Sequence, residues 1–88
     1  NPDTLRLEVV VNSEGLNFLR ANSPYADRIR ELADSNQNLS FLACGLAMQR
    51  AAVVDGAPVQ LLPDASRIDA AIKRILSRVN DGWVYVKS

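Results

Sequence analysis

The 88-residue chain has the length of one domain, and its 48% hydrophobic and 23% charged residues suit a globular protein rather than a disordered one. Ten basic and ten acidic side chains cancel to a formal net charge of zero, which offers no electrostatic basis for binding nucleic acid or an anionic membrane surface. No apolar run approaches the roughly 20 residues of a membrane-spanning helix. We therefore expect residues 1–88 to form one domain that binds neither nucleic acid nor membrane.

The cysteine and histidine content limits the cellular compartment that we expect and the kinds of catalytic and metal site that the chain can form. The single cysteine, Cys44, allows no internal disulfide, and no signal peptide is visible. These features favour the cytoplasm, with the periplasm left open for a chain whose signal peptide has been removed. The chain has no histidine, which excludes Cys–His and Ser–His dyads and most zinc sites. Its four glycines are isolated and form no phosphate-binding loop, so we expect no metal and no cofactor.

The first half of the chain predicts two strands with a helix between them. Its elements, in chain order, are a strand at 5–11, a turn at 12–15, one or two helical turns at 16–20, a helix from 23 to 33 and a strand at 39–43. The first strand alternates apolar and polar residues and ends in three valines, a pattern typical of a sheet edge. The helix opens with Ser23 as N-cap and Pro24 in the first helical position.

The second half continues the alternation. Its elements are a helix at 46–54, a turn at 55–56, a strand at 59–62 stopped by Pro63, a helix that begins at a cap on Ser66 and ends at 80–82, and a terminal strand at 83–86. The last helix carries the clearest apolar stripe, made of Ile68, Ala71, Ile72, Ile75, Leu76 and Val79. Strands alternating with helices imply right-handed crossovers, so we expect an α/β fold with a parallel sheet.

The start of the chain resembles a connection inside a domain. Asn1–Thr4 has the composition of a turn between a helix and a strand. In a doubly wound sheet the first strand is usually central, whereas the 5–11 strand has the pattern of an edge. These observations favour a preceding strand and helix outside this sequence; the alternative is a four-stranded sheet that begins here.

Cys44 is the strongest candidate for chemistry. It falls at the carboxyl end of the 39–43 strand, and Gly45 separates it from the helix that follows. Open α/β sheets bind their ligands at such strand ends. A helix N-terminus favours an anion and therefore lowers the pKa of a thiol, which makes it more nucleophilic. The alternative is that Cys44 only packs, since free cysteine is among the most buried residue types.

A second group of candidates follows the first strand. In a parallel sheet, the loop of Asn12, Ser13, Glu14 and Gly15 lies at the same edge as Cys44 and Gly45. We therefore predict a ligand-binding site formed by these residues; as an alternative, they are turn and cap residues. Arg50, on the helix after Cys44, could stabilise a thiolate if its side chain folds back.

Three stretches of the chain resemble the DsrE-like family, whose members are often described as sulfur-relay proteins. They are Ser23-Pro24-Tyr25-Ala26, Phe41-Leu42-Ala43-Cys44-Gly45 with Met48 and Arg50 after it, and Gly82-Trp83-Val84-Tyr85-Val86-Lys87. The resemblance covers most of residues 5–87. It implies a three-layer α/β sandwich with a mostly parallel sheet, a β-α unit ahead of the first strand, and assembly as homo-oligomers.

The resemblance also gives Cys44 a specific chemistry. In sulfur-relay members of the family a cysteine carries sulfane sulfur as a persulfide, and Cys44 matches its position. The expected partners are then a protein that donates sulfur and one that accepts it. Many relatives have a polar pair after Cys-Gly, whereas this chain has Leu46 and Ala47, which makes the surroundings of the thiol more apolar and raises its pKa.

Two classes of function therefore stand side by side. The first is a sulfur carrier or sulfurtransferase-like subunit that uses Cys44. The second is a non-catalytic oligomerisation module, or a small-ligand-binding module, of the same fold. Whether the protein is an enzyme stays open at this stage.

Overall fold

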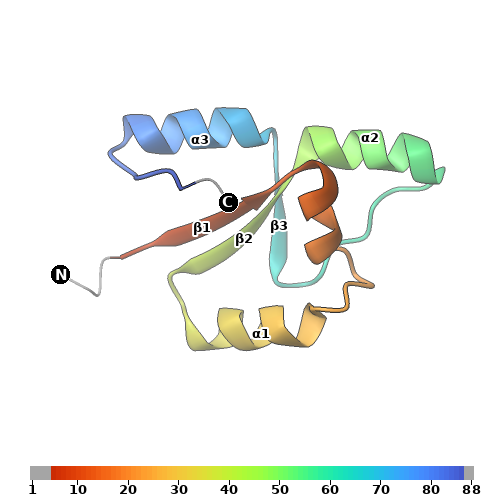
Figure 1. Cartoon of the computed structure of the whole chain (residues 1–88), viewed down its shortest axis with the longest axis horizontal. Coiled ribbons are helices and arrows are strands. Elements are labelled where there is room, and N and C mark those ends of the chain that lie inside the picture. The colour runs from red at the N-terminus through yellow and green to blue at the C-terminus, as the bar shows by residue number, and fades with distance from the viewer. Residues whose placement is uncertain (1–4, 87–88) are drawn as a thin grey trace.

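The computed structural model describes residues 5–86, which form a three-stranded parallel sheet with helices on both faces (Figure 1). In chain order the elements are β1 (Leu7–Val11), the 3₁₀ helix η2 (Ser13–Phe18), α1 (Ala26–Ser35), β2 (Leu39–Cys44), α2 (Gly45–Asp55), β3 (Ala65–Ile68) and α3 (Ala71–Asn80). The strand order is β1-β2-β3, with Val11 opposite Ala43 and Cys44 opposite Ile68. The expected α/β fold with a parallel sheet, built as a three-layer sandwich, is confirmed.

The alternation of side chains along the strands gives the sheet two apolar faces. One face packs against η2 and α1, where Leu16, Leu19 and Ile29 complete the larger core. The strand residues in that core are Val9, Val11, Phe41 and Ala43. The intervening residues Val10 and Cys44 face the other way and join Ala47 and Ala71 in a smaller cluster. Cys44 therefore lies on the face of the sheet that α3 covers.

Helix α3 is held over β1 by ion pairs. Both oxygens of Glu8 accept hydrogen bonds from Arg74 and Arg78, at 3.0 to 3.4 Å. The predicted apolar stripe of this helix is only partly buried, because Ala71 packs inward while Ile72 and Leu76 are exposed. The stripe therefore leaves part of its apolar surface uncovered by the described residues.

Three predicted elements differ in the structure. Residues 59–62 form no strand of the sheet; the Leu62 N–H donates to the Leu19 carbonyl and Leu61 makes one antiparallel bridge with Arg20. The third strand is Ala65–Ile68 instead, so the last helix begins at Ala71 without a side-chain cap and not at Ser66. Within the described part of the chain the terminal segment 83–86 pairs with no strand.

The remaining helices fall close to their expected bounds. The one or two turns at 16–20 correspond to η2, and the helix expected at 46–54 is α2. Helix α1 begins at Ala26, two residues after Pro24, because Ser23 caps the preceding turn and accepts a hydrogen bond from the Tyr25 N–H at 3.1 Å. Residues 1–4, from which a preceding β-α unit was predicted, lie outside the described residues.

Candidate active site

The candidate site is built around Cys44, the last residue of β2 and the N-cap of α2. The residue is only 6% exposed. Its Sγ accepts a hydrogen bond from the N–H of Ala71 at 3.4 Å. Ala71 is the first residue of α3, so the thiol lies at the N-terminal ends of two helices at once. N-terminal helix ends carry partial positive charge, which favours the thiolate over the thiol.

The electrostatic balance at Cys44 lowers its pKa. Burial is the largest single influence and raises the pKa of the thiol. The backbone N–H groups of Ala47, Ala71 and Leu46, together with the positive charge of Arg50, lower it by more. The net pKa therefore lies below the ordinary value of a cysteine. Backbone groups thus supply the stabilisation that the apolar side chains of Leu46 and Ala47 cannot.

Gly45 allows the close approach that this geometry needs. A Cβ at this position would lie 2.6 Å from the Ile68 carbonyl oxygen, 2.9 Å from the Asp69 carbonyl oxygen and 2.9 Å from Nε of Arg67. The connection between β3 and α3 therefore packs directly against the backbone at the start of α2. This contact brings the Ala71 N–H within reach of the sulfur of Cys44.

The predicted ligand loop lies only partly with Cys44. The register sets Val11 opposite Ala43, so Asn12 leaves β1 at the level where Cys44 ends β2. Asn12 and Gly15 line a groove beside β1, and Cys44 does not line that groove. Ser13 and Glu14 are exposed in η2, while Gly45 is buried against the β3–α3 connection. A joint binding site of the loop and the thiol remains a prediction.

Sequence reasoning missed two parts of the site. The Ala71 N–H is a backbone donor, and nothing in the side-chain pattern marks such a group. The ion pairs of Glu8 could have been predicted, since Arg74 and Arg78 are four residues apart on one helix and Glu8 is the acidic residue of the predicted 5–11 strand. The pKa of Glu8 lies below its usual value because Arg78, and to a smaller extent Arg74, stabilises the carboxylate against the effect of burial.

Neither a cluster of metal-ligating side chains nor a membrane-spanning helix is found in the described residues. Residues 5–86 contain no group of three or more His, Cys, Asp or Glu side chains placed to hold a metal ion. No helix in that range is long and apolar enough to cross a membrane.

Comparisons with known proteins identify a fold relative of unknown function. No family model matches the chain, and no curated protein is significantly similar to it. Among solved structures the chain is similar to a protein of unknown function, MTH1491, from Methanobacterium thermoautotrophicum, with a TM-score of 0.81 and 29% identity. The match covers 98% of this chain and 73% of that one. It supports the fold and indicates no activity.

Proposed function

We propose that the protein is a DsrE-like sulfur carrier in which Cys44 holds sulfane sulfur as a persulfide. The observation that carries the proposal is the position of the thiol at the N-terminal ends of α2 and α3, with the Ala71 N–H donating to Sγ. The same arrangement would stabilise the anion of a persulfide, because N–H donors favour negative charge on either sulfur species. A reducing compartment such as the cytoplasm suits a thiol that must stay free.

The proposed step is a thiol–persulfide exchange. The Cys44 thiolate attacks the outer sulfur of a donor persulfide, R–S–SH, and forms a new S–S bond. The S–S bond of the donor breaks and its inner sulfur leaves as a thiolate, which takes up a proton from solvent. The sulfane sulfur is transferred without net oxidation or reduction. Delivery to an acceptor is the reverse step with a different thiol, so the partners are a donor and an acceptor protein.

A second function rests on the burial of Cys44. A thiol that is 6% exposed, followed by apolar Leu46 and Ala47, also fits a module that keeps the fold without the chemistry and serves in homo-oligomer assembly. The two functions differ in what Cys44→Ser does. The carrier loses sulfur loading in this variant, whereas the assembly module keeps its size in solution and its partners.

The test combines the rate of thiol modification with mass. We expect the rate at which iodoacetamide alkylates Cys44 to rise with pH, with a midpoint below the pKa of roughly 8.5 of a free cysteine. We also expect a persulfide donor to add one sulfur atom, 32 Da, to the wild type but not to Cys44→Ala. Wild-type protein that gains no sulfur, under conditions that load a known carrier, contradicts the proposal.

A further inference from the structure

Helix α3 forms the cover over the Cys44 thiol. Cys44 is buried together with Ala47 and Ala71, and Val10 packs against this cluster. The Sγ of Cys44 accepts a hydrogen bond from the Ala71 N–H at 3.4 Å. Ala71 is the first residue of α3, and the helix runs from there to Asn80. A molecule that approaches the sulfur from this face of the sheet therefore meets the start of α3 first.

Apolar packing contributes little to the attachment of α3 to the sheet. Ala71 is 5% exposed and is the one buried residue of this helix, all of which belongs to the described part of the chain. Ile75 is half-buried, while Ile72 and Leu76 are each 62% exposed. The free energy of burial grows with the apolar area that is removed from water, and an alanine side chain offers little area. We therefore expect α3 to detach from the sheet at a smaller cost in free energy than the core elements.

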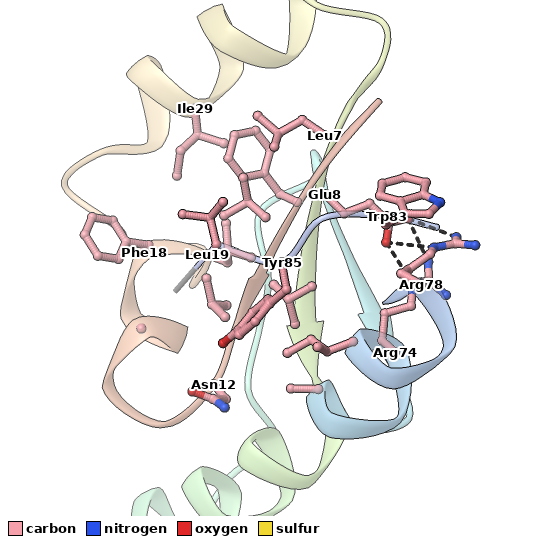
Figure 2. A pocket seen from close by; sticks show the side chains of 18 of the residues that line it. Leu7, Glu8, Asn12, Phe18, Leu19, Ile29, Arg74, Arg78, Trp83 and Tyr85 are labelled. Carbon is pink, nitrogen blue, oxygen red and sulfur yellow. Dashed lines mark hydrogen bonds and ion pairs between the residues drawn. The ribbon is translucent and has the colours of Figure 1, made fainter. Parts of the chain in front are cut away.

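Ion pairs with Glu8 provide the second attachment of α3. The two carboxylate oxygens of Glu8 accept hydrogen bonds from Arg74 and Arg78 at 3.0 to 3.4 Å (Figure 2). The Glu8 side chain is 12% exposed, and charged hydrogen bonds that are shielded from water are stronger than those in solvent. Arg78 also lies 5.0 Å from the centre of the Trp83 ring. These polar contacts fix to β1 the part of α3 that lies beyond its first turn.

We propose that α3 is a lid over Cys44 and that the Glu8 carboxylate is its latch. The lid turns about the β3–α3 connection, which packs closely against the backbone at Gly45. Release of Arg74 and Arg78 from Glu8 lets the helix lift from β1 and uncovers the sulfur. The lid rests on the proposed function only for its purpose, which is to admit a sulfur donor, and its movement is tested without sulfur.

The test compares the rates at which iodoacetamide alkylates Cys44 in the folded chain, at a pH above the midpoint of the reaction, so that differences in the pKa of the thiol do not contribute. Glu8→Gln removes the latch, and we expect this variant to react about fivefold faster or more, the factor that corresponds to one charged hydrogen bond. Glu31→Gln, the same change at an exposed position of α1, should stay within about twofold of the wild type. Equal rates in the wild type and Glu8→Gln overturn the proposal.

A second control separates lifting of the lid from unfolding of the whole chain. Ile29→Val removes one methylene from the core on the opposite face of the sheet, so it lowers global stability without changing a contact of α3. If α3 is a lid, this variant reacts at the wild-type rate. In mild urea the logarithm of the rate should also rise less steeply than that for global unfolding, because lifting one helix exposes less surface. Acceleration by Ile29→Val as large as that by Glu8→Gln contradicts the lid.

Sulfur loading, followed by mass, separates failure of the lid from failure of the carrier. A chain that gains no sulfur, yet is alkylated faster after Glu8→Gln, supports the lid and contradicts the carrier. A chain that gains sulfur, and is alkylated equally fast with and without the Glu8 carboxylate, contradicts the lid and supports the carrier.

Discussion

Replacement of Gly45 by alanine tests the packing that surrounds Cys44. The added Cβ would meet the Ile68 carbonyl oxygen at 2.6 Å, whereas carbon–oxygen contacts usually begin near about 3.3 Å. The β3–α3 connection must therefore move by roughly 0.7 Å, which is the difference between these two distances. Both close oxygens belong to the backbone, so a rotamer change cannot relieve the contact.

The magnitude follows from two opposing effects. Overpacking of this kind costs about 1–3 kcal/mol, and two rigid backbone contacts place Gly45→Ala at the upper end. Alanine gains back about 0.8–1.0 kcal/mol over glycine as a helical residue. We therefore expect a net loss of about 2 kcal/mol in the free energy of unfolding. Displacement of the Ala71 N–H should also make Cys44 react faster with iodoacetamide.

Gly15→Ala is the matched control. A Cβ there has Val11 Cβ at 3.5 Å as its nearest neighbour, which is an ordinary contact. This variant should stay within about 0.5 kcal/mol of the wild type. Urea denaturation followed by Trp83 fluorescence measures both variants. If Gly45→Ala is as stable as Gly15→Ala and leaves the reactivity of Cys44 unchanged, the β3–α3 connection does not pack as described.

Two further substitutions address the anchor of α3 and the main core. Glu8→Gln should cost about 1–2 kcal/mol at pH 7, a value discounted because Arg74 and Arg78 are one-third exposed, while Glu31→Gln on the surface of α1 changes little. Since the pKa of Glu8 is lower in the folded than in the unfolded chain, its contribution to the free energy of unfolding is present above the unfolded pKa of about 4.3 and is lost as pH falls through the folded pKa. The wild type and Glu8→Gln should therefore become equally stable in acid. Urea titrations in which their stabilities differ by a constant amount down to pH 3 contradict this. Leu19→Ala should cost about 2–5 kcal/mol because the side chain is 1% exposed, and a loss under about 1 kcal/mol would show that the core collapses around it.

The spacing of apolar residues along the sequence predicted the strands and helices whose apolar side chains pack in the core of the sheet. β1, β2 and α1 have apolar residues at regular spacing and a buried face, so spacing was sufficient to find them. α2 was found instead from its run of helix-forming residues. β3 could not be found this way, since Ala65, Ser66 and Arg67 form a short strand with little apolar character. Its position depends on pairing with β2, which is a tertiary interaction.

In the C-terminal part of the chain, the sequence pattern predicted more regular structure than the protein has. The apolar stripe from Ile68 to Val79 predicted a longer helix, which begins at Ser66, and Trp83–Val86 predicted a strand. Ile68 belongs to β3, and the side chains of Ile72 and Leu76 have no partner surface within residues 5–86. For Cys44, the sequence located the residue at the strand–helix junction, but the donor from Ala71 depends on the approach that Gly45 permits.

The burial of Cys44 beneath the start of α3 has a kinetic consequence. Since Cys44 is 6% exposed and its sulfur packs against the start of α3, we expect a reagent to reach it when α3 moves aside. The modification rate is then the intrinsic rate multiplied by the fraction of molecules that are open. Each 1.4 kcal/mol of closure free energy slows the reaction about tenfold. Because Glu8 holds α3 in place, protonation of a carboxylate on β1 would raise that open fraction. The thiol and the carboxyl group are then thermodynamically linked through one helix, although they share no contact.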